Sequence, residues 1–399
     1  MNRIRLSSCV GLVALIFVEA LNAQTLTVHG DQIAVDGRGR FLIFASYFDA
    51  MRRANATCAP VRSAATCSPL DADFAFLGAT NPAVPGRVDG IRILPNWWAG
   101  SSVLATDSLF DSSGAIRDSA HWSGSGTNPW DRFVAVLQAA KTYNLLVDVT
   151  FTIETIACSP SCPTTLANYQ TGIAGVLTKL RTEHPVLYRR VFFDLQNEMS
   201  INLPGADLAA RYSNAQALIT ALKPQNPLAI MTASVTNNPL PPTPSQAGAN
   251  AVMYQLPIVA FHDPRTPGRW FMDTTIRDVV AGIRTGLGTV VKPIALDEPQ
   301  KWADDPTPSH FTDAVKAAKK HGVALWTYHT ETSQDLVSQT MLAKMGGSTG
   351  AEAAVISALR PAADSQPEWG IRSLARPRHP GGVEDAAATT PTAPTALWD

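Results

Sequence analysis

The strongest constraint on the fold is an alternation along the chain of short apolar runs with longer amphipathic segments. The apolar runs are four to seven residues long and do not alternate with polar residues, as expected for strands of a parallel sheet that is buried on both faces. The runs are Phe41–Ala45, Gly90–Leu94, Leu145–Phe151, Val191–Leu195, Leu228–Thr232, Ile258–Phe261, Pro293–Leu296 and Val323–Trp326. Helices are predicted between them at Trp130–Tyr143, Leu166–Glu183, Ala206–Leu222, Thr274–Thr285 and Phe311–His321.

Eight successive strand–helix units favour closure into one barrel, a fold that commonly occupies about 250 residues or more. The rival arrangement is an open doubly wound sheet, which places a glycine-rich phosphate-binding turn after its first strand. That position is Ser46–Asp49, which contains no glycine. We therefore predict an α/β fold, a (β/α)₈ TIM barrel over residues 24–360. It begins with a β-hairpin in Leu26–Phe44 whose turn is Asp36–Gly37.

The two ends of the chain differ in composition from the predicted barrel. Arg3 and Arg5 precede an apolar stretch from Val10 to Ala20, and the small residue Ala23 follows at the expected cleavage site. This pattern is typical of a secretory signal peptide over residues 1–23, and its apolar core is short for a bilayer span. An uncleaved membrane anchor is the alternative. The signal predicts a secreted or periplasmic protein without a membrane segment after cleavage, and residues 361–399 are predicted to form a low-complexity, disordered tail.

Four cysteines remain once Cys9 is removed with the signal peptide. An even number of cysteines in an exported chain indicates disulfides, and four cysteines allow three connectivities. We expect Cys58 to pair with Cys67 and Cys158 with Cys162, because each pair closes a local loop. The spacing of Cys158 and Cys162 could also suggest a metal site, but zinc sites usually need a second cysteine pair or histidines close by, and no histidine lies near these two cysteines. No metal and no cofactor is therefore predicted.

The charge composition argues against nucleic acid as a binding partner. The formal net charge is −1, and no run of basic residues interleaves with aromatic ones, so nucleic-acid binding is not expected. A monomer is expected.

Polar residues follow the apolar runs at the ends where barrel enzymes carry their catalytic groups. Glu198 follows the fourth predicted strand and Glu298 ends the seventh. These strands face each other across a barrel, so both carboxylates can reach one ligand. Hydrolysis of a glycoside needs such a pair, since one carboxyl protonates the leaving oxygen and the other attacks or stabilises the anomeric carbon. Asp194 and Asp297 are interpreted as inward-packing neighbours.

These residues carry a family resemblance. Over roughly Leu26 to Leu359 the chain resembles glycoside hydrolase clan A, and within it looks most like family 5, the cellulase-type group. The most specific pieces are Asp194–Glu198, which reads DLQNE, and Ile294–Pro299, which reads IALDEP. The resemblance implies a retaining enzyme for β-glycosidic bonds, with Glu198 as acid/base and Glu298 as nucleophile.

The resemblance also implies roles for four further residues. Asn197 matches the residue that hydrogen-bonds the sugar 2-hydroxyl, and Arg92 matches the arginine that keeps the nucleophile ionised. His262 matches the histidine of the sixth strand, and Trp326 the aromatic floor under the reacting sugar.

The chain departs from the family pattern near the nucleophile and is rich in tryptophan at the expected catalytic face. The family usually carries a tyrosine two residues after the histidine of strand six, where this chain has Pro264. Tyr328 or Tyr47 is the candidate replacement. Aromatic rings stack on the C–H faces of sugars, so Trp97 and Trp98 are expected to contact a carbohydrate substrate.

Two other functions are compatible with the predicted fold. A catalytically silent carbohydrate-binding barrel would share the fold and the aromatic residues, although both glutamates are present in this chain. A metal-dependent barrel hydrolase would need a cluster of histidines and aspartates at the strand ends, and no His-x-His sequence follows the first strand.

The disulfide prediction can be tested directly. The non-reduced protein, digested with a protease, should yield one linked peptide pair containing Cys58 and Cys67 and another containing Cys158 and Cys162, in loops after the first and third strands. Mass spectrometry before and after reduction identifies both links. Crossed pairing, or free thiols throughout, would contradict the assignment.

Overall fold

The structure is a computed structural model, and it describes ten stretches of the chain. They are residues 24–55, 68–96, 108–124, 126–153, 165–202, 207–235, 255–262, 270–299, 301–330 and 340–367. The predicted signal peptide and nearly all of the predicted tail lie outside these residues, as do Trp97, Trp98 and the four cysteines of the predicted disulfides.

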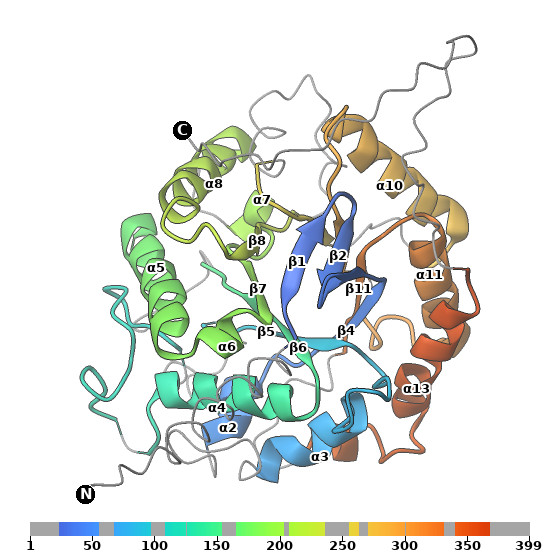
Figure 1. The fold of residues 1–399 in the computed structure, drawn as a ribbon, viewed down its shortest axis with the longest axis horizontal. Coiled ribbons are helices and arrows are strands. Elements are labelled where there is room, and N and C mark those ends of the chain that lie inside the picture. Colours follow the sequence, from blue (N-terminus) through green and yellow to red (C-terminus); the bar gives the residue numbers. More distant parts are fainter. Residues whose placement is uncertain are drawn as a thin grey trace, which may run out of the picture. The chain divides into compact units, whose positions relative to one another are not determined.

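Eight parallel strands form a barrel, as predicted (Figure 1). Around the barrel they lie in the order β8, β7, β6, β5, β4, β11, β10, β9. The barrel closes between β8 and β9 through a parallel bridge from Val235 to Phe261 and a 2.7 Å hydrogen bond from the His262 amide to the Val235 carbonyl. The strands are β4 (Leu42–Ser46), β5 (Gly90–Ile93), β6 (Leu146–Thr150), β7 (Val191–Asp194), β8 (Ile230–Thr232), β9 (Val259–His262), β10 (Ile294–Glu298) and β11 (Leu325–Tyr328).

Helices surround the strands, and all five predicted helices are present within one to three residues of their predicted ends. In the helix that begins at Pro129, the Asn128 side chain accepts a hydrogen bond from the Asp131 amide, a strong N-terminal cap. The described helices are α2 (Ala50–Asn55), α3 (Ser68–Leu77), α4 (Pro129–Thr142), α5 (Leu166–Glu183), α6 (Pro185–Tyr188), α7 (Met199–Asn202), α8 (Leu208–Leu222), α10 (Asp273–Leu287), α11 (Pro308–Lys320), α12 (Met341–Lys344) and α13 (Ala351–Asp364).

Helix α13 extends beyond residue 360, the predicted end of the barrel domain. The composition, rich in Pro, Ala, Thr and Gly, predicts a disordered tail from about Pro361. The helix instead continues through Pro361 to Asp364 and buries Ala362 and Ala363 against the barrel. Among the described helices, none is both long enough and apolar enough to span a membrane.

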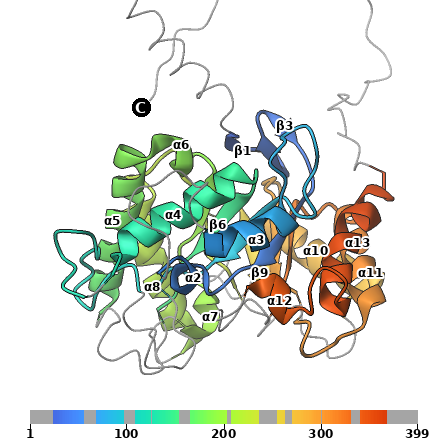
Figure 2. The same ribbon diagram turned by 90° about the horizontal axis from the view of Figure 1, so that it is seen from below.

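A three-stranded antiparallel sheet plugs the amino-terminal end of the barrel. It consists of β1 (Leu26–His29), β2 (Gln32–Val35) and β3 (Arg38–Gly39), with the predicted turn at Asp36 and Gly37, whose φ angles are 54° and 75°. Figure 2 shows this sheet at the opposite end of the barrel from α7. Its side chains join the inner apolar core of the barrel, which includes Leu26, Ile33, Val35, Leu42, Phe44, Leu146, Phe192, Ile230, Ala260, Ala295 and Leu325.

The Asp89 carboxylate, just before β5, joins the first barrel strand to the last helix. Its Oδ2 accepts a 2.8 Å hydrogen bond from the buried Ile43 amide and is ion-paired with Arg360 on α13. Arg40 approaches Oδ1 at 3.5 Å. Only 8% of Asp89 is exposed, so its loss leaves a buried amide and a guanidinium without their acceptor.

We predict that Asp89→Ala lowers the free energy of unfolding by about 2–3 kcal/mol, because buried hydrogen bonds to charged groups contribute on this scale. Urea denaturation measures the change as a lower midpoint with an unchanged slope. Asp278→Ala is the matched control, since Asp278 pairs with Arg277 on the surface and exposed pairs contribute little. Equal midpoints for the two variants would contradict the role of Asp89.

Candidate active site

The inward side chains of the barrel change from apolar to polar toward the carboxyl ends of the strands. In β6, Leu146 is followed two residues later by Asp148, and in β7, Phe192 is followed by Asp194. Residues two apart on a strand face the same side, so each aspartate lies inside the barrel beyond the apolar core. We call the resulting group of fully buried side chains the polar layer: Arg92, Asp148, Asp194, His262 and Asp297.

Glu298, at the end of β10, lies at the outer edge of the polar layer and is contacted by three cationic or titratable side chains. Arg92 Nη1 lies 2.8 Å from its Oε1, and His329 Nδ1 lies 3.1 Å from the same oxygen. His262 Nδ1 lies 3.0 Å from Oε2. The Glu298 side chain keeps 17% of its surface exposed, so the carboxylate remains accessible from the catalytic face.

These contacts determine the charge of Glu298. Burial by itself would raise the pKa of this carboxyl, but the positive charge of Arg92, followed by His329 and His262, outweighs it and holds the pKa well below the ordinary value of 4.5. Glu298 is therefore an ionised carboxylate at neutral pH.

Arg92 is the most extensively bonded residue of the polar layer. Its Nε donates to Thr150 Oγ1 at 3.0 Å, and its Nη2 donates to Asn197 Oδ1 at 2.8 Å. Asp148 lies 3.4 Å from Nε. Burial alone would lower the pKa of the guanidinium, but Glu298 and Asp148 raise it, so Arg92 stays charged. One fixed cation thus orients both Glu298 and Asn197.

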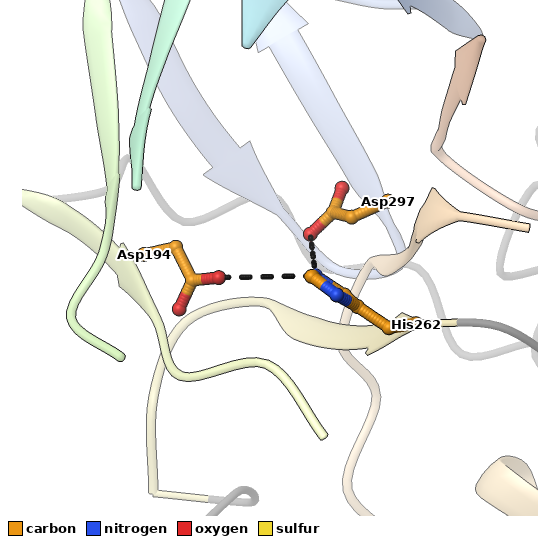
Figure 3. A group of neighbouring side chains, drawn as sticks. All are labelled: Asp194, His262 and Asp297. Carbon is orange, nitrogen blue, oxygen red and sulfur yellow. Dashed lines mark ion pairs between the residues drawn. The ribbon is translucent and has the colours of Figure 1, made fainter. Parts of the chain in front are cut away.

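Beneath Glu298, His262 lies between two buried aspartates (Figure 3). Its Nε2 is 4.0 Å from Asp194 Oδ2 and 3.9 Å from Asp297 Oδ2. Burial raises the pKa of Asp194, and it raises that of Asp297 to about 6. Burial and Arg92 would lower the pKa of His262, but Glu298 and Asp297 outweigh them and raise it.

The same three residues resemble a metal-binding group, as do Glu198, His262 and Glu298. Arg92 bears on this interpretation, because its Nη2 lies 3.3 Å from His262 Nε2 and arginine can only donate. A metal at that nitrogen would meet a fixed positive charge. The geometry favours an ionic network in which His262 directs Nδ1 toward Glu298, while its Nε2 lies among Arg92, Asp194 and Asp297.

Glu198 follows β7 in a left-handed backbone conformation, with a φ of 49°. Such a conformation costs roughly 1–2 kcal/mol for a residue with a Cβ, and strain of this kind is often found at functional sites. The Glu198 amide donates to Ser234 Oγ at 3.1 Å, and Ser234 Oγ donates to Asp194 Oδ2 at 2.5 Å. Asp194 therefore supports Glu198 through Ser234.

The structure brings both predicted glutamates together. One carboxylate oxygen of Glu198, one of Glu298 and a ring nitrogen of His262 all lie within 4.8 Å of one another. Asn197 and Arg92, which were also predicted from the sequence, complete this group through their 2.8 Å hydrogen bond. Asp194 and Asp297 point inward, as interpreted from the sequence.

Trp326 and the tyrosine candidates are not at this site, which corrects the sequence interpretation. In β11, Leu325 is paired with inward-facing Leu42, so Trp326 and Tyr328 face the helices. The Tyr328 hydroxyl donates to Glu352 on α13 at 3.2 Å, and the Tyr47 hydroxyl donates to Asp73 on α3 at 2.7 Å. Trp97 and Trp98 lie outside the described residues, so their predicted role stays a prediction.

Two residues of the site, His329 and Asp148, were not predicted from the sequence. His329 was given no role from the sequence, yet its Nδ1 lies 3.1 Å from Glu298 Oε1. It lies four residues after inward-facing Leu325, so counting every second residue along β11 would have placed it inside the barrel. Asp148 sits in the middle of an apolar run, and a charged residue at such a position is itself a signal of a buried ionic partner.

No protein-family model and no curated protein matches this sequence. Solved structures do match at the level of the fold. The endo-1,4-beta-mannanase from Rhizomucor miehei aligns with a TM-score of 0.53 at 11% identity, over 86% of this chain and 99% of that one. The endocellulase from Pyrococcus horikoshii aligns with a TM-score of 0.52 at 12% identity, over 84% of this chain and 98% of that one.

A third match is GH5_18 from Streptomyces cattleya, solved in complex with Manb1-4GlcNAc. It aligns with a TM-score of 0.55 at 12% identity, over 82% of both chains. Identities this low establish the shared architecture: the chain has the (β/α)₈ barrel fold of these glycoside hydrolase structures.

Proposed function

We propose that the protein is a retaining glycoside hydrolase that cleaves β-glycosidic bonds, with Glu298 as nucleophile and Glu198 as acid/base. The observation that carries the proposal is the approach of the two carboxylates, whose nearest oxygens lie within 4.8 Å. Retaining enzymes hold their two carboxyl groups about 5–5.5 Å apart, whereas inverting enzymes leave about 6.5–9.5 Å for a water molecule. Nearest oxygens this close are consistent with the shorter, retaining separation of the carboxyl groups.

In the first step, an oxygen of Glu298 attacks the anomeric carbon and forms a covalent bond to it. The bond from that carbon to the glycosidic oxygen breaks, and Glu198 donates its proton to the departing oxygen. Glu298 is suited to attack because Arg92 and the two histidines keep it ionised. The negative charge of Glu298 disappears in the resulting glycosyl-enzyme.

In the second step, Glu198, now a carboxylate, takes a proton from water as the water oxygen attacks the anomeric carbon. The bond to Glu298 breaks and its electron pair returns to the carboxylate. Two displacements at one carbon restore the β configuration.

Asn197 contributes to substrate binding in this proposal. Because its Oδ1 accepts from Arg92, its amide nitrogen is the atom that can donate to the sugar 2-hydroxyl. A hydrogen bond at this hydroxyl strengthens as positive charge develops on the sugar ring, so it stabilises the transition state more than the ground state.

The structural matches support a carbohydrate substrate without defining the sugar, since they include a mannanase and a cellulase. We therefore propose a β-linked polysaccharide or oligosaccharide, and export of the enzyme to the periplasm or the medium. The test is a screen of the purified protein on cellulose, mannan, xylan, mixed-linkage glucan and aryl β-glycosides, with the anomeric configuration of the first product followed by proton NMR. Binding without turnover on every substrate would indicate the catalytically silent barrel instead.

The two glutamates are predicted to differ in their response to the leaving group. Glu298→Ala removes the nucleophile, so turnover of every substrate should fall by about 10³-fold or more. Glu198→Ala should largely spare dinitrophenyl glycosides, which need little acid assistance, and should impair natural oligosaccharides far more. Steady-state kinetics on both substrate types measures the difference.

Azide provides the stereochemical check on the same two variants. It should give an inverted glycosyl azide with Glu298→Ala and a retained one with Glu198→Ala, because in the second case it attacks the glycosyl-enzyme. Glu183→Ala, an exposed surface position paired with Lys179, is the control and should behave like the wild type. Full activity in either catalytic variant would refute the mechanism.

A further prediction concerns activity in acid. Because the pKa of Glu298 lies well below 4.5, the nucleophile stays ionised as the pH falls through that value. The acidic limb of kcat/KM, which reports the free enzyme, should therefore lie below pH 4.5. Initial rates on an aryl β-glycoside between pH 3 and 8, with circular dichroism confirming that the protein stays folded, measure the limb. A limb above pH 4.5 in folded protein would show that Glu298 is not stabilised as described.

A further inference from the structure

His329 is held beside Glu298 by both its side chain and its backbone. It follows β11, is 3% exposed, and places Nδ1 3.1 Å from Glu298 Oε1. Its ring packs edge-on against Phe48, with centroids 5.1 Å apart. Its carbonyl accepts from the Trp302 amide at 3.3 Å, and a parallel bridge joins it to Lys301, just beyond β10.

The contacts to the carboxylate are unequal. Oε1 faces two nitrogens, Arg92 Nη1 at 2.8 Å and His329 Nδ1 at 3.1 Å, while His262 Nδ1 lies 3.0 Å from Oε2. Phe48 packs beside both groups on the Oε1 side, since the Arg92 guanidinium carbon lies 6.0 Å from the centre of its ring. The two donors on this side therefore share one apolar support.

We propose that His329 is a positioning residue that stabilises the carboxylate form of Glu298, and that it acts mainly in the second step by assisting the departure of Glu298 from the sugar. The inference rests on the proposed function. A ring nitrogen facing a carboxylate oxygen at this distance must carry its proton, because two lone pairs would repel each other. The contact is therefore worth most when Glu298 is fully charged.

The charge on Glu298 changes in opposite directions in the two steps. In the first step the carboxylate loses charge as it attacks, so a group that stabilises the charge gives little acceleration there. In the second step charge returns to the leaving carboxylate, so the same group lowers the barrier. Loss of His329 should therefore raise the pKa of Glu298, make it a poorer leaving group and slow hydrolysis of the glycosyl-enzyme.

The experiment compares His329→Phe, His329→Asn and the control His321→Phe on the dinitrophenyl β-glycoside that the wild type hydrolyses best. Phenylalanine keeps a ring against Phe48 and removes the nitrogens, whereas asparagine keeps an N–H near the position of Nδ1. His321 also lies 3.0 Å from a carboxylate, that of Asp273, but at the ends of α10 and α11.

With an activated leaving group the second step limits kcat. We expect His329→Phe to lower kcat and KM together, each by roughly tenfold for a change of about one unit in the pKa of Glu298, while kcat/KM changes by less. A burst of dinitrophenolate equal to the enzyme concentration should accompany the change. His329→Asn should recover most of kcat, and His321→Phe should match the wild type.

A ¹³C NMR titration of the Glu298 carboxyl gives a readout that does not depend on turnover, with Glu298→Gln identifying the signal. We expect its pKa to rise in His329→Phe and to return toward the wild-type value in His329→Asn. An unchanged pKa, or equal loss of kcat in both variants without a fall in KM, would overturn the role of His329. Absence of hydrolysis by the wild type, together with the expected change in pKa, would instead refute the proposed function and leave the contact intact.

Discussion

The buried ion pair between Arg92 and Glu298 is the interaction on which the rest of the site depends. A guanidinium with no exposed surface is unfavourable unless its donors are matched, because removing an ion from water costs several kcal/mol. Thr150, Asn197 and Glu298 provide acceptors on three other strands or strand ends, so matching this cation also fixes their relative positions. The charge of Glu298 and the orientation of the Asn197 amide therefore have one physical origin.

The barrel interior divides into two zones with different dielectric properties. The amino-terminal zone is apolar and sealed by the β1–β3 sheet, so it excludes water from below. The polar layer then carries more acidic than basic groups, and burial raises the pKa values of Asp148, Asp194 and Asp297. Only the carboxyl nearest to Arg92 and the two histidines has its pKa lowered among these four. The same buried environment thus raises the pKa of three carboxyls and, where cations face the carboxylate, lowers that of the fourth.

The sequence predicted the barrel strands and the positions of the two glutamates, because both depend on strands that are buried on both faces. Eight apolar runs without a polar–apolar alternation predicted the barrel, because a strand buried on both faces has no polar side. Glu198 and Glu298 could be located because they follow such runs. Burial on both faces also meant that the orientation of β11 could not be predicted. Every residue from Leu325 to Tyr328 is buried, so hydrophobicity does not distinguish the residues that face inward from those that face the helices. Pairing with β4 settles the orientation, and it moves Trp326 outward and His329 inward.

The plug at the amino-terminal end has a consequence for how the protein is assembled. Leu26, Ile33 and Val35 are among the first described residues of the chain, yet their core partners include Ile258, Ala295 and Leu325 from its second half. β4 likewise pairs with β11, the final strand of the barrel. Contacts between such distant segments form slowly, because a long loop must close before they add any stability. The apolar floor must therefore stay exposed until nearly the whole chain has been made. Apolar surface exposed in this way is prone to aggregate, so aggregation competes with folding until the last strands are in place.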